Sequence, residues 1–198
     1  MTTERERYEQ IEEIIGSIIP SITGIRTQPD GSDRYELLFD TASGQGIKAD
    51  HVSEGALMTL GVVTALTGTD ESGSSQLVML DGLETSLHPR AQRDLVHQLK
   101  KVTYQKTNAQ ILFTTHSPYI VDELSPDEVF LLNTDEEGIA HAKRLSEHPD
   151  VDRALDILTT GEFWSAEGED WVVDNAAGDG HSSFPDTASS SDQPASNP

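Results

Sequence analysis

The chain has 198 residues and a formal net charge of -22, with 13 Lys and Arg against 35 Asp and Glu. This length allows one domain with a hydrophobic core plus a tail, and the acidic surface argues against nucleic-acid binding through a basic patch. The absence of cysteine excludes a disulfide framework and a thiolate metal site. Because the sequence has neither a membrane-length apolar run nor a signal peptide, we expect a soluble cytoplasmic protein without membrane contact.

The first third of the chain predicts a helix, an antiparallel meander and a second helix. Isoleucines recur at helical spacing from Thr3 to Ile19, and Thr3 with Glu6 forms a capping box. The elements predicted next are a strand at Gly24–Thr27, a turn at 29–31, a strand at Tyr35–Phe39 and a turn at Ser43–Gly46. The meander leads into a helix over Ser53–Leu66, and a polar loop over Thr67–Ser75 follows.

Next come two short apolar strands, each followed by polar residues at its carboxyl end. Gln76–Leu80 is followed by Asp81, and the strand that begins at Gln110 is followed by Thr114, Thr115 and His116. A helix is predicted between them over Arg90–Lys106, so the two strands are parallel neighbours. Because ligands of open α/β sheets bind outside the carboxyl ends of the strands, Asp81 and His116 are expected side by side at a ligand-binding edge.

The last third of the chain predicts a hairpin, a short helix and a tail. The predicted elements are strands at Val129–Leu132 and Ala140–Arg144, a turn at Asp135–Gly138 and a helix at Val151–Leu158. From Asp174 onward the sequence is rich in Gly, Ser, Asp and Pro and poor in apolar residues, which predicts disorder. We therefore expect one folded lobe over 1–173 and a disordered tail over 174–198.

Several single residues allow both a structural and a functional interpretation. Ser53 precedes an amphipathic run and, taken alone, is better explained as a helix N-cap, although Gly55 would let free amides approach a phosphate. Glu84 is either a solvated loop acid or a partial general base, and His88 is better explained as fixing the turn before Pro89. Asp81 at a strand end fits a magnesium ligand, because hard oxygen ligands suit that ion.

The order of these residues resembles the ABC-like branch of AAA-type ATPases, which includes the RecF-like and overcoming-lysogenization-defect-like proteins. Four segments carry the resemblance: Val52-Ser53-Glu54-Gly55-Ala56, Asp81 to Pro89, Thr114 to Pro118, and Gly161-Glu162-Phe163-Trp164. The resemblance implies that Asp81 is the Walker B ligand of Mg²⁺ and that Glu84 and His116, the switch histidine, are catalytic. It also implies that Ser53, Glu54 and Gly55 form the signature that contacts ATP held by a partner.

Two departures from the family pattern limit what this chain can do alone. The position after Asp81, where the family has a water-polarising glutamate, is Gly82, so the Walker B motif is degenerate. The phosphate-binding loop G-x-x-x-x-G-K-[ST] is absent, and the nearest segment, Gly44–Ala49, has neither the spacing nor the hydroxyl residue. The sequence predicts an α/β protein: a partial P-loop NTPase fold, with a parallel sheet core preceded by an antiparallel meander.

Three functions compete at this point. The first is the C-terminal half of a split or truncated ATPase that binds ATP and Mg²⁺ only with a P-loop-bearing lobe or a homologous ATPase. The second is a degenerate, non-hydrolysing interaction subunit of such an ATPase. The third, a nuclease, would need a further acid cluster, and Asp135–Gly138 is better explained as a hairpin turn.

Overall fold

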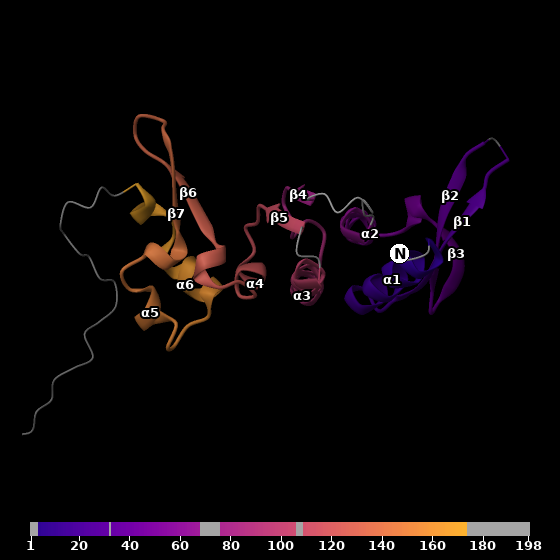
Figure 1. The fold of residues 1–198 in the computed structure, drawn as a ribbon, viewed down its shortest axis with the longest axis horizontal. Coiled ribbons are helices and arrows are strands. Elements are labelled where there is room, and N and C mark those ends of the chain that lie inside the picture. Colours follow the sequence, from indigo (N-terminus) through magenta and orange to yellow (C-terminus); the bar gives the residue numbers. More distant parts are fainter. Residues whose placement is uncertain (1–3, 32, 68–75, 106–108, 174–198) are drawn as a thin grey trace, which may run out of the picture.

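The computed structural model describes residues 4–31, 33–67, 76–105 and 109–173. The Thr3 cap and the tail predicted over 174–198 lie outside these residues, as does the loop predicted over Thr67–Ser75 except for Thr67, which is the last residue of a helix. Figure 1 shows three groups of elements in a row. The first helix and the meander lie at one end, the parallel strands with their helix in the middle, and the C-terminal hairpin with its helices at the other end.

The N-terminal group is an antiparallel sheet with one helix packed against it and a second helix packed against the first. Its elements are α1 (Glu4–Ile18), β1 (Ile22–Pro29), β2 (Tyr35–Thr41), β3 (Gly44–Lys48), a 3-10 turn (Ala49–His51) and α2 (Glu54–Thr67), with strand order β1-β2-β3. The predicted meander is confirmed, but the prediction of a turn over Ser43–Gly46 is wrong, because β2 turns at 42–43 and Gly44 already pairs with Thr41. Pairing with β2 therefore carries the chain through Lys48 as a strand.

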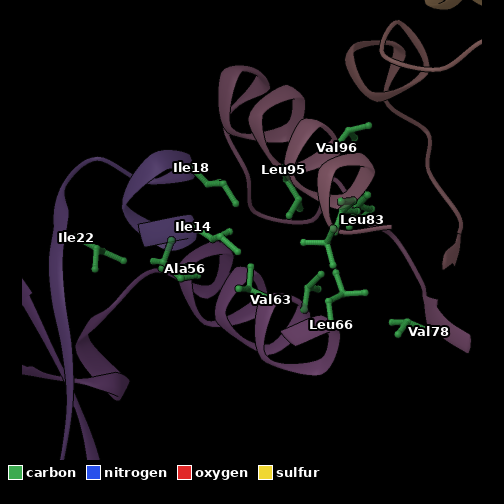
Figure 2. Packing of buried hydrophobic residues seen from close by; sticks show 14 of the residues in the cluster. Ile14, Ile18, Ile22, Ala56, Val63, Leu66, Val78, Leu83, Leu95 and Val96 are labelled. Carbon is green, nitrogen blue, oxygen red and sulfur yellow. The ribbon is translucent and has the colours of Figure 1, made fainter. Parts of the chain in front are cut away.

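The central group is the predicted parallel strand–helix–strand unit. β4 (Gln76–Leu80) pairs in parallel with β5 (Ala109–Phe113), and α3 (Pro89–Gln105) connects them. α3 buries Leu95, Val96 and Leu99. Figure 2 shows Leu66 of α2 and Leu95 of α3 pointing into one cluster with Leu83, which lies in the loop after β4. The loop after β4 is thus anchored in the main core.

The outer face of the parallel sheet is apolar and uncovered. Leu77, Met79 and Leu112 are 57%, 68% and 55% exposed, whereas the side chain of Val78 on the opposite face is buried. Parallel sheets are normally covered on both faces. Within the described residues, this sheet has two strands and one covered face.

The C-terminal group has a second core. It contains α4 (Pro118–Val121), a 3-10 turn (Pro126–Glu128), β6 (Phe130–Thr134), β7 (Ala140–Arg144), a 3-10 turn (Leu145–Glu147), α5 (Val151–Ala154), α6 (Thr160–Glu167) and a last 3-10 turn (Asp170–Val172). Val121, Leu145 and Phe163 are buried together in this core. The hairpin is confirmed, but the helix predicted over Val151–Leu158 ends at Ala154 and continues as turns. No helix of the described part meets the length and apolarity needed to cross a bilayer.

Candidate functional site

The loops after β4 and β5 meet at the carboxyl edge of the parallel sheet, as the sequence predicts. Thr114 N–H donates to Leu80 O at 3.0 Å and Leu83 N–H donates to Thr114 O at 3.1 Å, so backbone pairing continues beyond the two strands. The Thr114 hydroxyl donates to Asp81 Oδ1 at 2.5 Å and accepts from Gly82 N–H at 2.9 Å. The exposed Asp81 carboxylate is therefore held in a fixed orientation at the sheet edge.

Glu84 connects the loop after β4 to His116. Its Oε2 accepts from the Thr115 hydroxyl at 2.7 Å, and its Oε1 accepts from His116 N–H at 3.1 Å. Burial alone raises the pKa of Glu84. The hydrogen bonds from Thr115 and from backbone amides, with the nearby His116 ring, outweigh burial and hold the pKa below its ordinary value. Glu84 is thus a fixed anion beside the exposed His116.

Gly82 adopts a backbone conformation that disfavours a side chain. Its φ is +64°, in the left-handed region, and its carbonyl accepts from Thr85 N–H at 3.0 Å and from Thr85 Oγ1 at 2.7 Å. A Cβ atom at this position would lie 3.0 Å from Thr85 Oγ1. The position directly after Asp81 is therefore a closed turn that carries no carboxylate.

The start of α2 packs against the far end of the same loop. Glu54 Oε2 accepts from the Ser86 hydroxyl at 2.7 Å, and Gly55 is buried where a Cβ would lie 2.4 Å from Ser86 O. Ser53 is exposed, and its Oγ accepts from Ala56 N–H at 3.3 Å, which is the N-cap arrangement. Close helix–loop packing thus accounts for Gly55, and the cap bond accounts for Ser53, with no ligand required by either.

The structure gives roles to three residues for which the sequence predicted none. Thr114 and Thr115 orient the two carboxylates. Gln92 of α3 is buried, donates from Nε2 to Leu87 O at 2.9 Å, and accepts from the Ser117 hydroxyl. The two threonines could have been suspected from their place between an apolar strand and His116. Gln92 gives no such signal, because it lies among other polar residues at the start of an amphipathic helix.

The carboxyl edge of the sheet offers one candidate ligand for Mg²⁺. Across the part of the chain that the structure describes, no cluster of three or more His, Asp or Glu side chains could hold a metal ion. Asp81 offers one exposed, oriented carboxylate. Mg²⁺ in nucleotide sites typically takes one or two carboxylates and completes its shell with waters and phosphates. Asp81 therefore fits as one ligand of a magnesium–nucleotide complex.

The segment that most resembles a phosphate-binding loop in its glycines and lysine is part of the meander. Gly44–Lys48 is strand β3, and Lys48 Nζ lies 2.6 Å from Glu36 Oε1 on the neighbouring strand β2. A P-loop instead connects a strand to a helix. This segment lacks that connection, since it runs as a strand into the 3-10 turn at Ala49–His51.

These features together define an ATPase-like α/β protein with a fold of the P-loop NTPase type. The chain belongs to the family described as "AAA domain, putative AbiEii toxin, Type IV TA system", whose model matches residues 4–122. It is similar to the Septu protein PtuA of Bacillus thuringiensis, with 24% identity over 155 residues, 73% of this chain and 37% of PtuA. The chain thus spans little more than a third of that relative's length.

The fold is also similar to that of a solved chain from a study of "ATP-driven dimerization and DNA stimulated activation of SMC ATPases". The TM-score is 0.56 at 10% sequence identity, and the match covers 77% of this chain and 92% of that chain. At this identity the likeness concerns the fold alone.

Proposed function

We propose that this chain is the C-terminal lobe of an ATP-binding ATPase and completes a nucleotide site with a P-loop-bearing lobe. The observation that carries the proposal is the oriented Asp81–Glu84–His116 edge on a parallel sheet whose outer face is apolar and uncovered. Contiguous exposed apolar side chains commonly mark an interface. In this proposal the P-loop lobe covers Leu77, Met79 and Leu112 and brings the phosphates to Asp81.

The proposed roles are those that the family resemblance gives to these residues. Asp81 binds the Mg²⁺ of Mg·ATP, and His116, with its backbone fixed by Glu84, contacts the γ-phosphate. Ser53, Glu54 and Gly55 act in trans, at the nucleotide held by a partner lobe. ATP-driven dimerization, named for the SMC ATPases of similar fold, is the kind of association expected here. A cytoplasmic location remains part of the proposal.

Capture of partners from the native host tests the proposal. The tagged chain is incubated with lysate with and without Mg·ATP, and any captured protein is re-expressed and its affinity measured directly. We expect a protein with a G-x-x-x-x-G-K-[ST] loop whose binding tightens with Mg·ATP, since nucleotide that contacts both chains stabilises only the complex. Asp81→Asn and Ser53→Arg should remove the ATP-dependent part, whereas the exposed control Asp152→Asn should not. A chain that remains monomeric and binds no such protein refutes the proposal.

A second candidate, a non-hydrolysing subunit of such an ATPase, is favoured by the turn at Gly82. Gly82 has no carboxylate and its left-handed φ disfavours a side chain, and both oxygens of Glu84 already accept hydrogen bonds. Loss of a positioned general base costs about 10²- to 10⁴-fold in rate. ATP turnover by the assembled pair separates the two functions: turnover that falls with Asp81→Asn supports an ATPase, and ATP-dependent binding without turnover supports the interaction subunit.

A further inference from the structure

Helix α4 starts two residues after His116 and is in unusually close contact with α6. Gly161 of α6 is buried, and a Cβ at this position would lie 2.2 Å from Pro118 O and 2.6 Å from Asp122 Oδ1. Ordinary contact begins at 3.4 Å, so a methyl group would have to displace the Pro118 carbonyl by about 1 Å. A glycine is therefore required for α4 to lie where it does.

Asp122 reinforces this contact at the other end of α4. Its Oδ1 accepts from Gly161 N–H at 2.8 Å, and its Oδ2 accepts from Arg93 Nη2 of α3 at 3.2 Å. One carboxylate thus joins α3, α4 and α6. The Asp122 side chain is 14% exposed, so its bond with Gly161 N–H is partly shielded from water, whereas its bond with Arg93 lies at the surface.

The start of α4 is fixed to the site loop. The Ser117 hydroxyl donates to Gln92 Oε1, and both residues are 7% exposed. Gln92 Nε2 in turn donates to Leu87 O, in the loop that carries Glu84. Because α4 has only four residues, a displacement at Pro118 cannot be absorbed within the helix and passes to Ser117 and His116.

We infer that Gly161 and Asp122 are positioning residues for His116, so that the C-terminal group of elements sets where the histidine lies. The contact from α6 fixes α4, and α4 fixes the backbone of His116 against Glu84. That the position of His116 matters for nucleotide binding rests on the function proposed above. The positioning of His116 by α4 and α6 is itself a property of the isolated chain.

Nuclear magnetic resonance of the isolated chain tests the inference without nucleotide or partner. In Gly161→Ala we expect shifted amide signals at His116 and Glu84 and faster hydrogen exchange of the His116 amide, which donates to Glu84. Gly61→Ala in α2 is the matched control, because nothing lies within 4 Å of the added Cβ. A merely structural role would lower the melting temperature but leave the His116 and Glu84 signals in place.

Substitution of Asp122 provides a second test if Gly161→Ala does not fold. Asp122→Ala removes the acceptor for Gly161 N–H and should reproduce the His116 changes, whereas Asp122→Asn keeps an oxygen at that position and should restore most of the wild-type signals. Folded Gly161→Ala or Asp122→Ala protein with unchanged His116 exchange overturns the inference. Failure of the ATP-dependent partner experiment leaves this result untouched, so the two proposals can fail separately.

Discussion

Substitution of Gly55 by alanine should destabilise the chain, although alanine is the better helix former. A Cβ at this position would lie 2.4 Å from Ser86 O and 2.9 Å from Leu87 Cδ2, so the loop after β4 must move by about 1 Å. Overpacking of this kind costs about 1–3 kcal/mol, and the better propensity of alanine returns at most about 1 kcal/mol. With the full return subtracted, we expect a net loss of up to about 2 kcal/mol in the free energy of unfolding.

Gly61 provides the matched comparison in the same helix. It is exposed, and nothing lies within 4 Å of an added Cβ, so Gly61→Ala should gain about 0.5–1 kcal/mol. Urea unfolding of both variants measures the difference, and about 2–4 °C of melting temperature is expected for each kcal/mol in a chain of this size. Equal stabilisation by both substitutions would refute the reasoning that Gly55 is required for helix–loop contact.

The remaining predictions concern the site and the uncovered sheet face. Because the pKa of Glu84 is lowered in the folded chain, its stabilising effect is present above the ordinary glutamate pKa of about 4.3 and is lost as pH falls through the lower folded value. Thr115→Val should weaken this acid dependence of stability in urea titrations; an unchanged dependence contradicts the assigned cause. Gly82→Glu should leave ATP turnover of the isolated chain at the level of Asp81→Ala and cost about 1–2 kcal/mol, because φ at 82 is left-handed; increased turnover would show that the turn opens. Met79→Asp should change the free energy of unfolding by less than about 0.5 kcal/mol, since the side chain is 68% exposed, yet weaken binding of the P-loop-bearing partner; unchanged binding would show that the partner does not cover this face.

The sequence was sufficient for the features that depend on local pattern. An apolar segment of five residues followed by Asp81, a helical period, and a second apolar segment ending before His116 predict a parallel strand–helix–strand unit, which the structure confirms. The absence of the P-loop motif is a matter of residue types and spacing, so it was equally visible. Both predictions need only near neighbours along the chain.

Local pattern failed where pairing with a distant segment decided the conformation. Glycines at 44 and 46 favoured a turn, but hydrogen bonding to β2 makes Gly44–Lys48 a strand. A different failure occurs at Val151–Leu158, which has a helical pattern although the helix ends at Ala154 and the chain continues in turns with local bonds, such as Leu158 N–H to Ala154 O at 2.8 Å. Strand pairing and packing supply more free energy than the weak preference of single residues, so tertiary context overrides it.

The partners of the site residues were decided by tertiary structure alone. Thr114 meets Asp81, and Thr115 meets Glu84, across more than 30 positions of sequence. Gly55 resembled a phosphate-binding glycine, but its neighbour in space is the backbone of Ser86. The type of a residue determines which groups its side chain can bind. Which of those groups lies within hydrogen-bond distance is determined only in the folded chain, because contacts between distant segments depend on the packing of the whole core.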